Sequence, residues 1–427
     1  MSITTGSAQA GGAVRWYREP TKDQWLAWVA GWLGWMLDAF DFTMFLMIMV
    51  PISKEFGVPL TDVAFVLSVT LWLRLVGAVT SGWFADRIGR KTPLMVSILL
   101  YSLCNFAAGF SPSFAVLFLF RGLLGLGMGG EWPAGAALAM ESWPARSRGF
   151  MSAILQGSWS LGFLMASLVY GLLFNSIGWR GMLWIGILPA FAVIYVRFFV
   201  KEPAVWSENR ALQYAENRQM HTPLFSIFKP AVLGNTLTAC WWMVSGFIVY
   251  YSINALFATH LQKDLNLSPA MVATPVALAN LVAFLAMGFW GVLADRIGRR
   301  WAMIIPAAFA IFVTPVYLLS HDLTTIIIGF TVQGLFGQAI YGQNPSYLAE
   351  RFPTEVRATA GAFVYHLGSF VAGFIPLILT GIATNFGVGF GISMLIGTIV
   401  GASSFILAVL CGPETKGKVL DSKLVLA

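Results

Sequence analysis

A ten-residue segment occurs twice in this chain, and the repetition limits the folds that the chain can adopt. Gly82–Lys91 reads GWFADRIGRK and Gly291–Arg300 reads GVLADRIGRR, so the two copies lie 209 positions apart. Two further pairs of segments have the same offset: Lys54–Val58 with Lys263–Leu267, and Glu141–Pro144 with Glu350–Pro353. Three matches at one offset predict an internally duplicated chain with halves of roughly 200 residues.

Long apolar runs between these charged segments predict membrane-spanning helices. Hydrophobic residues make up 58% of the chain and charged residues 11%, and the mean hydropathy is +0.75. Helices are required because lipid offers the backbone no hydrogen-bond partners. We therefore expect an all-α integral membrane protein with 12 transmembrane helices in two six-helix repeats. The predicted spans are Trp25–Val50, Val63–Phe84, Thr92–Phe110, Phe114–Met140, Phe150–Phe174, Gly181–Val200, Ala231–Phe257, Ala270–Leu293, Trp301–Leu319, Leu323–Leu348, Ala358–Ala383 and Gly387–Cys411.

The positions of Lys and Arg predict that both termini are cytoplasmic. Of these 26 residues, three fall on the outer side (Lys54, Arg180 and Lys263) and two fall within spans (Arg74 and Arg121). The rest lie on one side, as the positive-inside rule requires of cytoplasmic loops. The net charge of +7 is therefore explained by a rim facing anionic lipid rather than by nucleic-acid binding. The predicted domains are a cytoplasmic tail 1–24, a six-helix bundle 25–200, a cytoplasmic linker 201–230, a second bundle 231–412 and a cytoplasmic tail 413–427.

Other classes of function lack their sequence signatures. The chain contains no GxxxxGK[ST] motif, which argues against an ATP-driven pump. Cys104, Cys240 and Cys411 have no metal or disulfide spacing, and no catalytic triad or redox motif is present. We therefore expect no enzyme activity, no catalytic or metal-binding residue and no cofactor.

Two motifs resemble those of the major facilitator superfamily. The repeated GxxADRxGR[KR] is similar to that superfamily's cytoplasmic loop motif, and Arg121–Pro133 fits its RxxxGxGxGxxxP motif. The resemblance covers nearly the whole chain. It implies the major facilitator fold, secondary active transport by alternating access, and a multi-pass plasma-membrane protein, in bacteria an inner-membrane protein.

Three segments of the first half narrow the resemblance further. Asp38–Asp41 (DAFD), Leu71–Ala78 (LWLRLVGA) and Gly130–Gly149 resemble the sialate/lactate:proton symporter group. Aromatic-acid:proton symporters share a similar acidic pair. The chain lacks the insert of longer sialate members, which favours a small monocarboxylate such as lactate or pyruvate. Asn254–Asp264 departs from the pattern of fungal lactate permeases.

Five ionisable residues lie deep within the predicted spans of the first half: Asp38, Asp41, Arg74, Arg121 and Glu131. Each charge at a helix centre costs about 2.5–3.5 kcal/mol, so the five must pair, face water or be neutral. Three acids and two bases leave one acid in excess, which is a candidate proton carrier. We assign proton coupling to Asp38, Asp41, Arg121 and Glu131, with Glu131 the first candidate; the resemblance supports Arg121. Binding of a substrate carboxylate and pairing with an aspartate are equally consistent for Arg74.

Neutral polar residues predominate in the second half and suggest hydrogen bonds to substrate. The predicted substrate-binding residues are Arg74, Gln156, Trp159, Asn254, Asn280, Gln333, Gln338, Tyr341 and His366. On a continuous helix Tyr341 would lie within about 80° of both Gln333 and Gln338. Interhelical hydrogen bonding by the glutamines, and packing of His366 and Trp159, are the alternatives.

The family resemblance implies a separate set of gate residues. In that family the motif acid contacts helix ends of the opposite half and helps to close the cytoplasmic side. The predicted cytoplasmic gate residues are Asp86, Arg87, Arg90, Glu141, Arg148, Asp295, Arg296, Arg299, Glu350 and Arg357.

These features together predict proton-coupled symport of a small organic anion by alternating access. A sialate or aromatic-acid symporter, a neutral sugar or polyol transporter, an exporter and a receptor-like membrane protein are the alternatives. The expected partners are the lipid bilayer, a small carboxylate and protons, with neither nucleic acid nor ATP, and we expect a functional monomer.

Overall fold

The computed structural model describes residues 16–221, 223–266 and 269–426, so residues 1–15 of the predicted N-terminal tail lie outside it. Within these ranges every regular element is a helix. The first half contains η1 (Trp16–Arg18), α1 (Lys22–Phe56), α2 (Leu60–Ile88), α3 (Lys91–Ala108), α4 (Phe114–Ser142), η2 (Ala145–Ser147), α5 (Arg148–Ile185) and α6 (Ala190–Phe199). Two short helices follow, α7 (Ala204–Ala215) and α8 (Pro223–Ser226).

The second half repeats the first in its helix bounds. It contains α9 (Pro230–Asn254), α10 (Phe257–Lys263), α11 (Pro269–Ile297), α12 (Arg299–Leu318), α13 (Leu323–Gly337), η3 (Ala339–Tyr341), α14 (Asn344–Arg351), α15 (Arg357–Ala372), α16 (Ile375–Asn385) and α17 (Gly389–Cys411). Both ends of α11 lie 209 residues after those of α2, and α15 begins 209 residues after α5. The offset of the sequence motifs is therefore the offset of the structural repeat.

Local signals in the sequence explain where the long helices start and stop. Thr21 and Gln24 form a reciprocal capping box at the start of α1, and Gly57 ends that helix in the left-handed conformation with φ 63°. Ser113 caps α4, and Asp322 caps α13 through the Thr325 amide.

Eleven helical segments of the described residues are long and apolar enough to span a membrane, one fewer than predicted. One of them, Ala145–Phe199, has 55 residues and would be about 80 Å long as a single helix, against about 30 Å of hydrocarbon. Gly178, with φ 62° and ψ −175°, interrupts it between the predicted fifth and sixth spans. The two spans therefore remain separate passes.

Three predicted spans of the second half are interrupted rather than continuous. The seventh is interrupted only near its end, after α9, and α10 begins at its last residue, Phe257. The tenth divides into α13, η3 and α14, and the eleventh into α15 and α16. Pro345 and Pro376 stand in the first turn of α14 and α16, where a missing amide hydrogen is tolerated. Broken helices in a membrane are stable where they are covered by protein or line a cavity.

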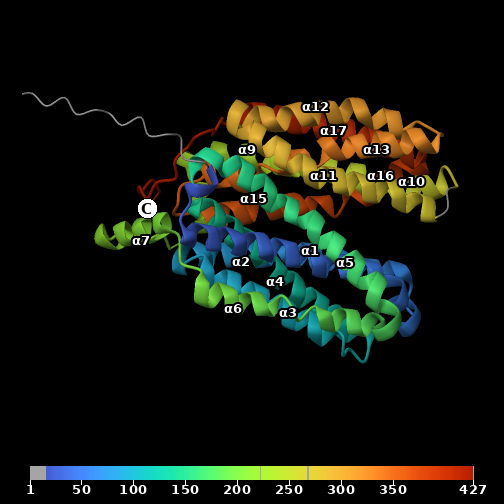
Figure 1. The fold of residues 1–427 in the computed structure, drawn as a ribbon, viewed down its shortest axis with the longest axis horizontal. Coiled ribbons are helices and arrows are strands. Elements are labelled where there is room, and N and C mark those ends of the chain that lie inside the picture. Colours follow the sequence, from blue (N-terminus) through green and yellow to red (C-terminus); the bar gives the residue numbers. More distant parts are fainter. Residues whose placement is uncertain (1–15, 222, 267–268, 427) are drawn as a thin grey trace, which may run out of the picture.

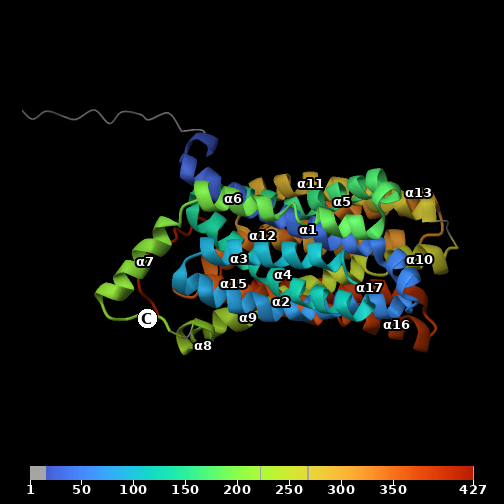
Figure 2. The ribbon, with the colours of Figure 1, turned by 90° about the horizontal axis from the view of Figure 1, so that it is seen from below.

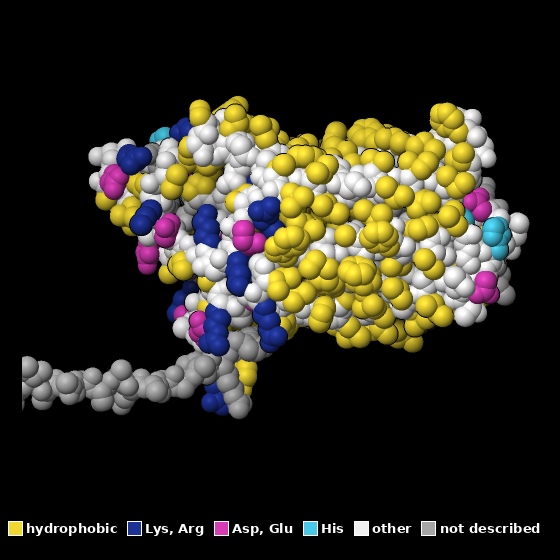
Figure 3. Space-filling model, turned by 90° about the horizontal axis from the view of Figure 1, so that it is seen from above, with side chains coloured by type: hydrophobic (Ala, Val, Ile, Leu, Met, Phe, Trp, Pro, Cys, Tyr) yellow, Lys and Arg dark blue, Asp and Glu magenta, His cyan; other side chains and the backbone are white. Residues whose placement is uncertain are grey.

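The two halves lie side by side and meet along equivalent helices (Figures 1 and 2). Helix α2 packs against α15, and α5 packs against α11, so each seam joins the second helix of one half to the fifth of the other. Apolar side chains cover the middle of the molecule, whereas Lys and Arg gather at the end near α7 (Figure 3). The cytoplasmic location of that end stays a prediction from charge.

Close contact between α2 and α4 depends on glycine. A Cβ on Gly129 would lie 2.1 Å from the Arg74 carbonyl oxygen, and one on Gly77 would lie 1.9 Å from that of Leu126. Such distances are far inside van der Waals contact, so any larger residue must push the helices apart. This packing sets the depth at which Arg74 sits.

We expect Gly129→Val to destabilise the first half by about 1–3 kcal/mol or more, because the overpacked helices cannot separate without losing other contacts. Thermal unfolding of the purified protein in detergent measures this. Gly171→Val is the matched control, since a Cβ at Gly171 meets no atom within 4 Å. Equal melting temperatures for the two variants would contradict this account of the packing.

Candidate functional site

A cavity of about 100 Å³ lies between the halves, with walls from both. Six of the nine residues predicted to bind substrate line it: Arg74, Gln156, Trp159, Gln338, Tyr341 and His366. Gln338 and Tyr341 come from the interrupted stretch between α13 and α14, where the backbone leaves the helix to reach the cavity. The structure thus brings most of the predicted set together.

Aromatic side chains form much of the cavity wall, and sequence reasoning missed most of them. Trp35 contacts Trp159 with ring centroids 4.6 Å apart and ring planes tilted by 38°, and Tyr365, Tyr250 and Tyr251 line the same space. Helical spacing from the predicted polar residues is a signal that could have identified them. Trp35 lies one turn before Asp38, and Tyr250 lies one turn before Asn254.

The other three predicted residues lie elsewhere. Asn254, Asn280 and Gln333 line a second cavity of about 10 Å³ within the second half, which Gln338 also borders. The prediction that Gln333, Gln338 and Tyr341 share one helix face was wrong, because α13 ends at Gly337. Gln333 is buried, and neither side-chain amide atom has a hydrogen-bond partner.

An ion pair joins α2 to α1 at the wall of the central cavity. An Arg74 guanidinium nitrogen lies 2.5 Å from an Asp38 carboxylate oxygen, and the two side chains are 5% and 0% exposed. Arg74 also lines the cavity, and its Nε makes no hydrogen bond. Arg74 is therefore paired with Asp38 and can still contact a ligand in the cavity.

Arg121 and Asp41 form a second charged group deeper in the first half. Arg121 donates to the Asn105 amide oxygen at 3.2 Å, its guanidinium lies 4.0 Å from the centre of the Phe45 ring, and Asp41 is its main electrostatic partner. All of these polar groups are fully buried. Arg74 is thus ion-paired with Asp38, whereas Arg121 acts on Asp41 only electrostatically and both Asp41 carboxyl oxygens lack a hydrogen-bond partner.

Glu131 is the third acid, and neither of its carboxyl oxygens has a hydrogen-bond partner. It is fully buried on α4, facing Gly34 of α1, where a Cβ would lie 2.3 Å from Oε1. Its electrostatic neighbours are Asp38 and Arg74. A charged carboxylate without a partner is very unfavourable at such a site, so the arrangement favours a proton on this group of acids.

At the end of the molecule that carries the repeated motifs, Asp86 binds the opposite half. Its carboxylate accepts hydrogen bonds from the amides of Ala358 and Thr359 at 3.1 and 2.8 Å. These amides belong to the first turn of α15, where the helix dipole favours an anion. Arg90 donates to Asp86 and Glu141. Burial alone would lower the pKa of Arg90, but the carboxylates of Glu141 and Asp86 raise it above its ordinary value.

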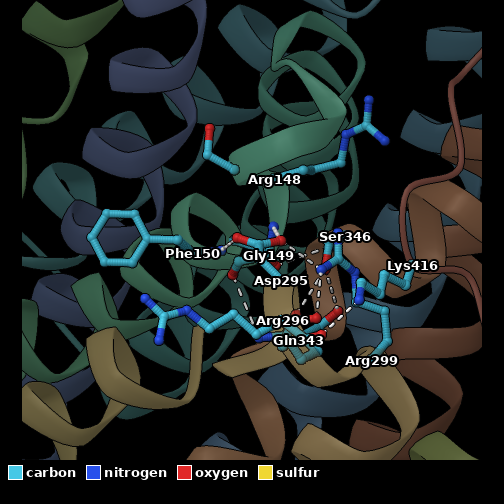
Figure 4. Close-up of polar contacts among 12 residues, drawn as sticks. Arg148, Gly149, Phe150, Asp295, Arg296, Arg299, Gln343, Ser346 and Lys416 are labelled. Carbon is cyan, nitrogen blue, oxygen red and sulfur yellow. Dashed lines mark hydrogen bonds and ion pairs between the residues drawn. The ribbon is translucent and has the colours of Figure 1, made fainter. Parts of the chain in front are cut away.

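The second copy of the motif makes the same contacts in the opposite direction (Figure 4). Asp295 accepts from the amides of Gly149 and Phe150 at the start of α5, both at 2.9 Å. Arg299 donates to Asp295 and Glu350. The contact pattern is thus duplicated together with the sequence.

Two ion pairs connect the halves at this end. Arg357 lies 2.7 Å from Glu141, and Arg148 lies 3.4 Å from Glu350. Among the described residues, these are the ion pairs that cross between the halves, so the seam is closed at the motif end. Arg87 instead stacks on Trp83 of its own helix, and the guanidinium of Arg296 points away from Arg299 (Figure 4).

The C-terminal segment and two further acids add to this closure, and sequence reasoning did not single them out. Thr415 donates to Glu350 at 2.6 Å, and Arg148 donates to the Lys418 carbonyl oxygen at 2.8 Å. Glu202 and Glu414 accept from the first amides of α3 and α12. The sequence signal for these two acids is weak: Glu202 precedes a proline at the end of the first half, and Glu414 follows a proline at the end of the second.

We expect loss of the Asp86 charge to open the motif end, because asparagine offers the two α15 amides one acceptor oxygen instead of two and has no negative charge to interact with the helix N-terminus. Asp86→Asn, combined with Ala137→Cys as a buried reporter at the seam, should raise the thiol labelling rate by about tenfold, the equivalent of ~1.4 kcal/mol. The matched control is Asp23→Asn, which breaks an exposed pair with Lys201 inside one half. Equal labelling of both variants would show that Asp86 does not hold the seam.

Comparison with known proteins supports the assignment of the fold and the family. The family model for the Major Facilitator Superfamily matches residues 31–259 and 243–424. The sialic acid transporter NanX of Escherichia coli is 28% identical over 95% of this chain and 98% of its own length. The probable 4-methylmuconolactone transporter of Cupriavidus pinatubonensis is 30% identical over 95% of this chain and 94% of its own length.

Solved structures show the same fold. The proton:xylose symporter XylE, with 6-bromo-6-deoxy-D-glucose bound, superposes with a TM-score of 0.74 at 17% identity, covering 93% of this chain and 98% of that one. The predicted helical membrane fold of two repeats is thereby confirmed, as is the expectation that the protein is a multi-pass membrane transporter and not an enzyme. The chain belongs to the major facilitator superfamily.

Proposed function

We propose that this transporter moves a small organic anion together with a proton. The observation that carries the proposal is the Arg74–Asp38 ion pair at the cavity wall. A guanidinium fits a carboxylate in two parallel hydrogen bonds, and a substrate carboxylate would compete with Asp38 for it. Protonation of the acid group would release Arg74 to the substrate, so proton and anion would bind together.

Glu131 is the proposed seat of the proton. Asp38 is paired with Arg74, and Asp41 has Arg121 as its main electrostatic partner, so Glu131 is the acid in excess. Its oxygens lack hydrogen bonds, as do those of Asp41. Asp38, Asp41 and Arg121 complete the proposed coupling group. A monoanion moving with one proton carries no net charge, which avoids the work of moving charge against the membrane potential.

A flat, conjugated carboxylate is the substrate class that the cavity supports best. The rings of Trp35, Trp159, Tyr365 and the two adjacent tyrosines 250 and 251 offer π faces on which such an acid can stack. One relative is named as a transporter of 4-methylmuconolactone and another of sialic acid. Lactate and pyruvate, favoured by the sequence, offer no ring to these walls, so we place them second, with sialate as a further alternative.

Release on the other side would require the motif end to open. We propose that the Asp86 and Asp295 contacts form and break as the halves rock, since each links one half to a helix N-terminus of the other. The proposal includes a functional monomer driven by the proton gradient without ATP. The same machinery can run in either direction.

Uptake by reconstituted protein tests the anion site. In liposomes with an inward proton gradient, we expect accumulation of labelled benzoate, with lactate, pyruvate and sialate as competitors. Arg74→Ala should reduce accumulation by about 100-fold or more, because the carboxylate loses a charge-assisted pair worth about 3 kcal/mol. Arg74→Lys keeps the charge without the planar fork and should be intermediate.

Arg180→Ala is the matched control for that experiment. Arg180 is also a paired arginine of the first half, 2.6 Å from Glu55, but its side chain is 31% exposed and lies outside the cavity. We expect this variant to transport normally. Full transport by Arg74→Ala, or uptake of a neutral polyol in preference to every acid, would contradict the proposal.

The proposed stoichiometry predicts little response to membrane voltage. Because one proton neutralises one monoanion, a potassium diffusion potential imposed at equal pH should change the initial uptake rate by less than about twofold, whereas a second proton would add about 2.3 kcal/mol per 100 mV. A strong voltage dependence at fixed pH would rule out the one-to-one ratio.

A further inference from the structure

Tyr101 of α3 is a buried hydroxyl for which the transport scheme above has no use. Its side chain is fully buried in the first half, and its hydroxyl has no hydrogen-bond partner. Buried hydroxyls are nearly always hydrogen-bonded, since an unmade bond costs about 1–3 kcal/mol. A tyrosine without a partner in the middle of a bundle therefore requires an explanation.

The charged residues around Tyr101 suggest an explanation for its unpaired hydroxyl. Its electrostatic neighbours are, in order of strength, Asp41, Glu131, Asp38 and Arg74. Tyr101 stands one helical turn before Asn105, which binds Arg121, and it packs on Gly127 of α4, one turn before Glu131. The residue therefore lies beside both charged groups. The same six-helix bundle also contains the polar side chains of Asn105 and Cys104 on α3, Arg121 on α4, and Tyr195 of α6, whose hydroxyl donates to the Leu26 carbonyl oxygen.

A phenol hydroxyl is suited to connect two carboxyl groups that exchange one proton. It can donate to a carboxylate and accept from a protonated carboxyl, so it can bind either acid in either state. Phenylalanine has neither capacity, although it has the same shape. Proton relays of this kind are a common use of ionisable groups inside membranes.

We propose that Tyr101 relays the coupling proton between Asp41 and Glu131. The inference rests on the proposed proton-coupled function and adds a path inside it. In this structure the hydroxyl and the oxygens of both acids are not hydrogen-bonded, so the side chains must first move into contact. When Asp41 is protonated and Glu131 is charged, the hydroxyl then donates its proton to Glu131 and takes up the proton of Asp41. The phenol is neutral before and after, and one proton has moved from one acid to the other. Tyr101 is a positioning and relay residue and does not touch the substrate.

Tyr101→Phe separates proton movement from substrate movement. In liposomes, we expect exchange of labelled benzoate at equal pH on both sides to stay within about twofold, while accumulation driven by a proton gradient falls by about tenfold or more. Accumulation requires proton transfer in every cycle, whereas exchange can proceed with the proton in place. Tyr101→His keeps a group that both donates and accepts, and should restore much of the accumulation.

Tyr317→Phe is the matched control. Tyr317 stands in α12, the third helix of the second half, and its side chain is also fully buried, but no charged residue is among its electrostatic neighbours. We expect this variant to behave as the wild type in both assays. A melting temperature for each variant shows whether it is folded.

Several outcomes would overturn the inference. Undiminished accumulation by Tyr101→Phe would do so, as would an equal loss of exchange and accumulation in the folded variant, which indicates a packing role. If Tyr101→Phe does not fold, Tyr101→His decides, and its failure to accumulate would contradict the relay. Wild-type protein that exchanges benzoate without ever accumulating it would instead contradict the proposed function.

Discussion

Burial of five ionisable side chains in one six-helix bundle requires each of them to pair with an opposite charge, face water or be neutral. Arg74 pairs with Asp38 at 2.5 Å, and Arg121 faces Asp41 in the same apolar surroundings. Breaking such a buried pair by removing one partner typically costs 3–5 kcal/mol. The third acid, Glu131, can be accommodated most readily with a proton. In the proposed scheme, the link between charge balance and proton content therefore lies in the first half and does not depend on the substrate.

The duplicated motif gives the molecule a second constraint, now between the halves. Each motif acid binds two backbone amides at the start of a helix in the other half, and each motif arginine holds a glutamate that also pairs across the seam. One motif acid reaches from the first half to the second, and the other reaches from the second half to the first. The contacts at both seams are therefore made in the same state of the molecule. Backbone amides and ion pairs can be exchanged for water at modest net cost, unlike packed apolar surface, which suits contacts that must break in every cycle.

The site residues of the first half were predicted from the sequence more completely than those of the second half. Charged residues in an apolar run are rare, so Asp38, Asp41, Arg74, Arg121 and Glu131 stand out, and the structure gathers them in one interior. The second-half residues depend on where helices break. Gln338 and Tyr341 reach the cavity because the chain leaves α13 at Gly337, and the sequence pattern of an apolar span does not reveal that break. The sequence did not identify aromatic residues of the cavity wall such as Tyr365, because aromatic side chains are common throughout the spans. Roles in coupling, binding and gating stay predictions.

Infrared difference spectroscopy of the purified protein tests most directly whether one buried acid carries a proton. A protonated carboxyl absorbs apart from a carboxylate, so titration reports it without any assumption about the substrate. We expect a protonated carboxyl band at neutral pH that is absent in Glu131→Gln and retained in Asp86→Asn. If the wild-type protein shows no protonated carboxyl at neutral pH, or if the band survives in Glu131→Gln, the central claim is contradicted.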